Sequence, residues 1–193
     1  MSDFSVVTVA TADGARSEET GHALAERLGY RYVNEDVVAR AAELAGVTPE
    51  EIERAEHSEP LLARLMNAMV GVMWVEGGWL PADAPIDRTP AYRAMIRAAI
   101  DQVAAAGQAV IVAHGAGVQL AGRPDVLRVW VTASPEVRAA RIAEQRGSTP
   151  AEASRSLEKA DAERAAYLRR FYEVREERAT SYDLTAKDKK KRA

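Results

Sequence analysis

The segment VVTVATADGARSEETG, residues 6–21, decides the fold of this chain. It begins with a run of β-branched apolar residues, continues through a turn around Gly14, and passes into a helical pattern that ends near Gly29. A strand, a loop and a helix in this order form the layout that places a phosphate group at a helix N-terminus. The segment therefore predicts an α/β fold with a loop of the phosphate-binding type.

The loop lacks the side chains that phosphate-binding loops use. The pattern GxxxxGK[ST] supplies glycines around the phosphates, a lysine against their charge and a hydroxyl near Mg²⁺. In that register Arg16 stands at the second glycine, Ser17 at the lysine and Glu18 at the hydroxyl. Ser17 can cap the helix, and Glu18 and Glu19 are each favoured at its positive end by about 0.3–1 kcal/mol. The loop is then either a self-capped turn or a phosphate site in which Arg16 replaces the lysine.

Composition indicates one globular domain with a sizeable core. The chain has 193 residues, of which 47% are apolar and 28% charged, and its net charge is only −3. No cysteine is present, which excludes disulfides and thiolate metal sites. No apolar run approaches the ~20 residues that cross a bilayer. We expect a cytoplasmic protein with no membrane contact, and no set of metal ligands stands out.

Five short β-branched runs punctuate a largely helical sequence. They lie at residues 4–10, 30–33, 109–114, 126–132 and 182–186. The run at 109–114 is apolar on both faces, which is typical of a central parallel strand. Because helical patterns separate the runs, the sequence predicts a five-stranded parallel sheet wrapped by helices.

The helices divide the chain into regions. We expect one domain over 1–186, with a helical insert at 34–107 after the second strand. The last helix of the insert runs over 90–106 and ends at Gly107. Ser134 and Thr149, each followed by proline, cap two further helices in a lid region at 134–172. Residues 187–193 form a basic tail without apolar partners, predicted to be disordered.

Three blocks of the chain resemble the cytidylate kinase-like proteins of the P-loop nucleoside monophosphate kinase group. The blocks are LAERLGYRYV at 24–33, VIVAHGA at 110–116 and DAERAAYLRRFY at 161–172. The resemblance implies a three-layer P-loop fold, ATP with Mg²⁺ as donor, and a nucleoside monophosphate such as CMP as acceptor. It also implies an arginine-bearing lid that closes over the transferring phosphate.

The resemblance assigns roles to eleven residues. Those on the donor side are Gly14, Ala15, Arg16, Ser17 and Arg138; those near the acceptor are Asn34, Arg93 and His114; and those that screen phosphate charge from the lid are Arg141, Asp161 and Arg164. Phosphoryl transfer relies on positioning and charge stabilisation of this kind. Arginines on an exposed helix are equally compatible with a plain solvated surface.

The chain departs from the family on both sides of the expected site. Two of the three loop glycines are replaced, and Asn34 stands where the family tends to have an aspartate. His114 stands where the family has an arginine, so a permanent cation becomes an imidazole that is mostly neutral at pH 7. These departures leave two functions open: a nucleoside monophosphate kinase, or a non-catalytic homologue that binds nucleotides or serves in regulation or assembly.

Two other features suggest partners. The insert carries an apolar stripe at helical spacing, which indicates core or a homodimer interface. Its members are Leu61, Leu62, Leu65, Met66, Met69, Val70, Met73 and Trp74. The lysine-rich tail is short and lacks aromatic companions, so nucleic acid is not an expected partner.

Overall fold

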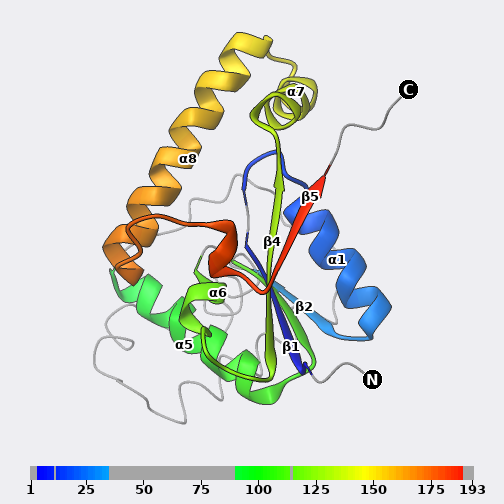
Figure 1. Ribbon diagram of the computed structural model, residues 1–193, viewed down its shortest axis with the longest axis vertical. Coiled ribbons are helices and arrows are strands. Elements are labelled where there is room, and N and C mark those ends of the chain that lie inside the picture. Colours follow the sequence, from blue (N-terminus) through cyan, green and yellow to red (C-terminus); the bar gives the residue numbers. More distant parts are fainter. Residues whose placement is uncertain (1–3, 11, 35–89, 114, 189–193) are drawn as a thin grey trace. The chain divides into compact units, whose positions relative to one another are not determined.

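The computed structural model describes residues 4–10, 12–34, 90–113 and 115–188 (Figure 1). The chain divides into two compact units, residues 1–32 with 109–193 and residues 33–108. In chain order the described elements are β1 (Val6–Ala10), α1 (Ser17–Leu28), β2 (Arg31–Asn34), α5 (Pro90–Ala106), β3 (Ala109–Val112), α6 (Ala116–Gln119), β4 (Val126–Ala133), α7 (Pro135–Arg146), α8 (Pro150–Tyr172), the 3₁₀ helix η1 (Ala179–Ser181) and β5 (Leu184–Asp188).

The strands form one five-stranded parallel sheet in the order β2-β3-β1-β4-β5. β1 is central, and its Val7 pairs with Val110 of β3 on one side and with Leu127 of β4 on the other. The chain leaves β1 towards β2, whereas it leaves β3 towards β4 across β1. The order therefore reverses between β1 and β3, and the predicted α/β fold with a five-stranded parallel sheet is confirmed.

Valines from alternate positions of the central strands make the core that α1 covers. They are Val7 and Val9 of β1, Val110 and Val112 of β3, and Val129 and Val131 of β4, packed with Ala25 of α1. α6 lies against the opposite face of β1, where Gly117 approaches Thr8 (Figure 1). Because both faces of β1 and β3 are covered, these two strands are buried at every position and read as continuous apolar runs rather than alternating ones.

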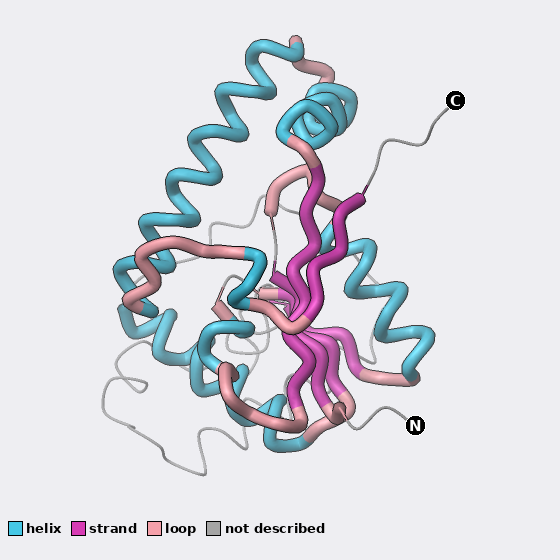
Figure 2. Tube along the Cα trace, viewed as in Figure 1, coloured by secondary structure: helices cyan, strands magenta, loops and turns pink. Residues whose placement is uncertain are grey.

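The helical hairpin of α7 and α8 begins as predicted. The Ser134 hydroxyl accepts a hydrogen bond from the Val137 N–H at 3.4 Å, and Thr149 and Glu152 form a reciprocal capping box. The two helices enclose a small apolar cluster of their own, made of Ala139, Ile142, Ala153 and Leu157. Figure 2 shows the hairpin beyond the carboxyl end of β4, from which the chain passes directly into α7.

The insert is described only in part. α5 (Pro90–Ala106) has the predicted bounds, and Gly107 follows it with φ 67°. Residues 35–89, which carry the apolar stripe, lie outside the described residues, as do His114 and residues 189–193. None of the described helices is both long and apolar enough to cross a membrane.

Two local expectations differ from the structure. β5 starts at Leu184 instead of residue 182 and includes Lys187 and Asp188, which we had placed in a disordered tail. The residue before it, Asp183, binds Arg128 of β4: the carboxylate accepts from the guanidinium at 2.8 Å, and this hydrogen bond lowers the pKa of Asp183. α6 was not predicted, since four residues are too few to show a helical period.

Gly21 lies where α1 comes close to the sheet. A Cβ added there would lie 2.4 Å from Cγ2 of Val112 and 3.1 Å from the Tyr32 ring. We therefore expect Gly21→Ala to lower the free energy of unfolding by about 1–3 kcal/mol, in spite of alanine's better helix propensity. Urea denaturation measures the change.

Val112→Ala provides the matched control, because it removes the atom that the new Cβ would meet. The double variant is expected to be more stable than the sum of the two single losses predicts, with a coupling of about 0.5–3 kcal/mol. Additive losses would show that Gly21 is not in close contact with Val112.

Candidate functional site

The turn between β1 and α1 is closed by hydrogen bonds within itself. The Ala15 N–H donates to the Ala12 carbonyl at 3.0 Å, and the Ala12 N–H donates to the Ser17 hydroxyl at 3.4 Å. Ser17 is buried as the first residue of α1, so its hydroxyl faces back into the turn. The predicted Ser17 cap is therefore wrong: the N-cap is Arg16, and α1 begins without a side-chain cap.

Arg16 adopts a left-handed backbone conformation, with φ 63° and ψ 34°. This conformation costs a non-glycine residue roughly 1 kcal/mol, and phosphate-binding loops carry a glycine at this position. The side chain is 55% exposed, and its Nε lies 3.1 Å from the carboxylate of Glu19. The cation expected to replace the missing lysine is thus paired with an acid of its own helix.

Gly14 holds the turn against α7. Its φ is 70°, and a Cβ there would lie 2.6 Å from the Arg138 carbonyl oxygen. Neither the backbone conformation nor the available space admits a side chain. The one glycine that the loop retains is therefore required by the contact between the turn and the hairpin.

Arg138 joins three segments through one guanidinium. It is only 7% exposed; its Nε donates to the Asp13 carbonyl at 2.6 Å, and its two terminal nitrogens donate to the Asp161 carboxylate at 3.0 and 2.7 Å. Arg141, one turn later in α7, donates to the Gly14 carbonyl at 3.0 Å. The structure thus brings together four predicted site residues, Gly14, Arg138, Arg141 and Asp161.

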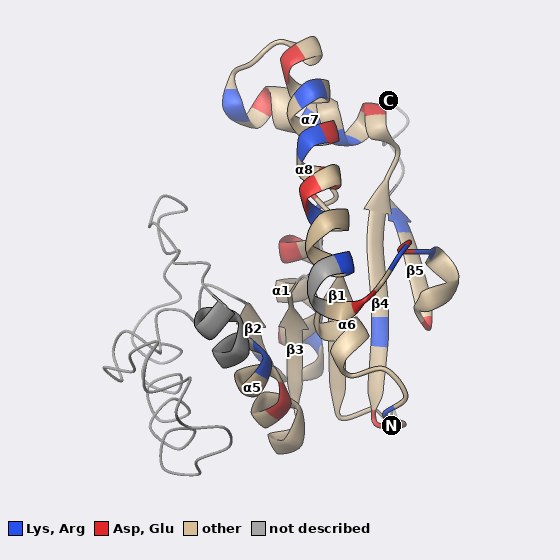
Figure 3. Ribbon diagram, turned by 90° about the vertical axis from the view of Figure 1, so that its left-hand side faces the viewer, with Lys and Arg blue, Asp and Glu red and all other residues tan. Residues whose placement is uncertain are grey.

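Charged residues of both signs lie along the hairpin (Figure 3). Not all of them reach the turn: Arg146 of α7 donates to the Ser156 hydroxyl and stays exposed. Arg138 and Arg141 differ from it because they bind backbone oxygens of the turn. In α7 the arginines therefore divide into two that hold the turn and one that lies on the surface.

Arg164, the third predicted lid residue, lies in a different environment. It is 9% exposed, its Nε donates to Glu177 at 2.8 Å, and the Tyr182 hydroxyl donates to the same carboxylate. Burial, together with this hydrogen bond, raises the pKa of Tyr182 above its usual value. The Tyr182 ring stacks on Trp130 of β4 with 5.8 Å between centroids. Arg164 is thus bound by the segment that follows α8 rather than by the turn.

The carboxyl end of β3 carries an aromatic contact that sequence reasoning missed. A Cβ added to Gly115 would lie 2.2 Å from Cζ of Tyr172, the last residue of α8. The Tyr167 ring lies 5.9 Å from that of Tyr172. Both tyrosines belong to the block at 161–172, whose resemblance to the family is the signal in the sequence that could have indicated them.

The roles predicted for the residues near the acceptor stay predictions. Asn34 is the last residue of β2 and is half-buried, the side chain of Arg93 in α5 is not described, and His114 lies outside the described residues. In the part of the chain that the structure describes, no three His, Asp or Glu side chains gather as metal ligands would.

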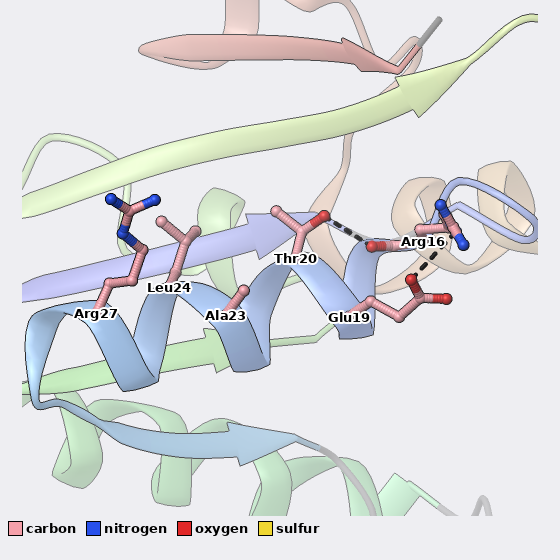
Figure 4. Close-up of a pocket in the computed structure, with 6 residues that line it drawn as sticks. All are labelled: Arg16, Glu19, Thr20, Ala23, Leu24 and Arg27. Atoms are coloured by element: carbon pink, nitrogen blue, oxygen red, sulfur yellow. Dashed lines mark hydrogen bonds and ion pairs between the residues drawn. The ribbon is translucent and has the colours of Figure 1, made fainter. Parts of the chain in front are cut away.

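A shallow depression of about 380 Å³ lies on the outer side of α1 (Figure 4). Its lining residues are Arg16, Glu19, Thr20, Ala23, Leu24 and Arg27, all from the N-cap and body of this one helix. Of the residues expected at the donor phosphates it includes only Arg16. The depression is therefore a feature of the surface of α1 and not the site formed by the turn and the hairpin.

The sequence matches the model of the cytidylate kinase-like family over residues 6–190. The chain belongs to the cytidylate kinase-like family. The match includes the turn, the sheet and the hairpin described above. No curated protein matches this sequence closely enough to count as a relative.

Solved structures with a similar fold share little sequence with this family member. An uncharacterised protein from Eubacterium ventriosum has a TM-score of 0.55 at 15% identity, covering 94% of this chain and 86% of that one. Shikimate kinase from Bacteroides thetaiotaomicron has a TM-score of 0.44 at 14% identity, covering 93% and 83%. Shikimate kinase from Acinetobacter baumannii, in complex with shikimate, has a TM-score of 0.46 at 12% identity, covering 97% and 85%.

Arg138→Met tests whether this guanidinium holds the turn to the hairpin. The variant keeps most of the aliphatic volume but leaves the Asp13 carbonyl and the Asp161 carboxylate without their donor. We expect a loss of about 1.5–3 kcal/mol in the free energy of unfolding, measured by urea denaturation. Arg146→Met on the same helix is the control and is expected to change stability by less than about 0.5 kcal/mol. Equal effects would contradict the assignment.

Arg16→Gly tests the strain at the N-cap of α1. Glycine adopts the left-handed conformation without cost, so we expect the free energy of unfolding to rise by about 0.5–1 kcal/mol although an exposed ion pair is lost. Arg27→Gly, in the last turn of α1, is expected to fall in stability by up to about 1 kcal/mol. Thermal and urea unfolding of both variants decide the sign, and a destabilised Arg16→Gly variant would show that the Arg16 side chain stabilises the turn.

Proposed function

We propose that this member of the cytidylate kinase-like family binds a nucleotide weakly and transfers phosphate slowly or not at all. The proposal rests on the hydrogen bonds and the ion pair that the turn after β1 forms within the protein. The N–H groups of Ala12 and Ala15 and the carbonyls of Asp13 and Gly14 are bound within the protein, and the expected cation, Arg16, is paired with Glu19. The absence of cysteine fits a reducing cytoplasm, where ATP is available.

The missing lysine has no substitute buried in the turn. Ser17 occupies that register, is itself buried, and accepts a hydrogen bond from Ala12. Removing one preorganised charge-stabilising group from an active site typically lowers the rate by about 10²–10³-fold. Loss of the lysine alone therefore predicts a turnover far below that of a typical kinase.

The carbonyls of the turn are held by the hairpin. Asp13 and Gly14 accept hydrogen bonds from Arg138 and Arg141, two residues that the family resemblance placed at the phosphates. Guanidinium groups bound to backbone oxygens and to Asp161 have less positive charge to offer a phosphate. The hairpin is thus used to stabilise the turn, which supports attenuated catalysis.

Anion binding at α1 is retained in part. The helix begins without a side-chain cap, so the dipole and the first N–H groups favour an anion there. Glu18 and Glu19 in the first turn oppose that attraction. We expect a dissociation constant for ATP on the order of 1 mM, about −4 kcal/mol.

An active nucleoside monophosphate kinase is the second candidate, and one observation favours it. Arg16 is more than half exposed at the turn, so its guanidinium can leave Glu19 for a donor phosphate at little cost. In this reading Asn34, Arg93 and His114 bind an acceptor such as CMP, and Mg²⁺ accompanies ATP.

Calorimetric titration with ATP·Mg²⁺ and with CMP, followed by a coupled assay for ADP release, separates the two candidates. We expect weak heats of binding and turnover at least about 10²-fold below a typical kinase rate of 1–100 s⁻¹. Turnover in the ordinary kinase range, lost in Arg16→Ala but kept in Arg27→Ala, would establish the second candidate. No binding of either nucleotide at millimolar concentration would contradict both.

A further inference from the structure

The carboxyl ends of β1 and β3 border the place where the strand order of the sheet reverses. In open parallel sheets ligands bind in the crevice outside the strand ends at such a point. The turn after β1 lies on one side of this place, and Gly115 follows β3 on the other. Both belong to the same compact unit as α8.

α8 has contacts on both sides of this crevice. Asp161 is joined through Arg138 to the turn after β1, and Tyr172 lies against Gly115 after β3. Residues 161, 164, 168 and 172 are spaced by three or four, so they share one face of the helix. Leu168 on that face is buried. Arg164 therefore lies on the side of α8 that faces the crevice. It follows Asp161, which is joined to the loop after β1, by one helical turn.

Arg164 is already bound to an anion of its own chain. The chain reverses after α8 through Glu173, which has φ 57°, and brings Glu177 back to the helix. Glu177 is 15% exposed, and its carboxylate accepts hydrogen bonds from two nitrogens of the Arg164 guanidinium. Tyr182 donates a further hydrogen bond to the same carboxylate. A buried guanidinium needs an anion of this kind, because an unpaired buried charge is costly.

We propose that Arg164 is an anion-binding residue of this crevice and that Glu177 is a built-in competitor for it. Carboxylate and phosphate oxygens accept the same pair of hydrogen bonds from a guanidinium. A diphosphate or phosphate group carries more negative charge than a carboxylate. It replaces the Glu177 carboxylate on Arg164 when the segment 173–178 moves away. The chain thereby keeps its anion affinity low until that segment is released.

The proposal rests on the proposed function only in the identity of the ligand, since the phosphate group would belong to a nucleotide. Inorganic pyrophosphate tests the anion site without a nucleoside. Failure of wild-type protein to bind ATP would therefore contradict the proposed function, whereas the response of variants to pyrophosphate decides this inference.

Glu177→Gln removes the competing charge, and calorimetric titration with pyrophosphate measures the result. We expect binding about tenfold tighter than in the wild type, which corresponds to 1.4 kcal/mol. Glu176→Gln is the matched control: it makes the same change in net charge at the neighbouring residue, which is exposed and paired with Arg178. Equal affinities of Glu177→Gln and wild type, or an equal gain in Glu176→Gln, would overturn the proposal.

Two further variants make the test independent of folding losses. The double variant Arg164→Gln with Glu177→Gln is expected to lose the gain, and a gain that persists without Arg164 would overturn the proposal. Glu177→Asp keeps the charge but draws the carboxylate back by one methylene, so it is expected to bind pyrophosphate several-fold tighter. If Glu177→Gln does not fold, as circular dichroism would show, Glu177→Asp decides, and an unchanged affinity there overturns the proposal.

Discussion

The candidate site depends on the hydrogen bonds that the Arg138 guanidinium donates. From a buried position in α7 it donates to the Asp13 carbonyl and to the Asp161 carboxylate, and so joins the turn after β1, the first hairpin helix and the second. Gly14 packs against the backbone of the same residue. A buried arginine must have all of its charge compensated, and here the turn and α8 supply the oxygens. The conformation of the turn and the position of the hairpin therefore depend on one another.

That dependence explains how the turn after β1 keeps its shape without the glycines and the lysine of the phosphate-binding pattern. Loops of this kind are held open by glycines and by the ligand that they bind. In this chain Ser17, Arg138 and Arg141 take over the stabilising role, and Arg16 occupies a strained position that a glycine would adopt freely. The fold of the cytidylate kinase-like family is kept, and polar groups of the turn are bound by other parts of the protein. Function then has to be argued from these groups and not from the fold.

Features that depend on neighbouring residues were predictable from the sequence. Ser134 and Thr149 cap their helices because each side chain reaches an N–H three residues away, and the apolar runs pair as parallel strands. The Ser17 cap was wrong although it is local, because the Ala12 N–H competes for the same hydroxyl. Arg138, Arg141 and Asp161, which the family resemblance assigned to the donor side and the lid, lie together beside the turn, and their roles in binding or catalysis stay a prediction. No sequence pattern indicated that Arg138 and Arg141 would bind the carbonyls of Asp13 and Gly14.

The sequence by itself determined the five strands, the helices α1, α5, α7 and α8 and membership of the family, because periodicity, caps and motif blocks are properties of contiguous residues. Only the tertiary structure decided which anion each arginine meets. Arg138 and the Asp13 carbonyl are 125 residues apart, and Glu177 reaches Arg164 only after the chain has reversed past α8. A hydrogen bond depends on a separation of about 3 Å in space. No spacing along the chain specifies that distance until the sheet and the hairpin have packed.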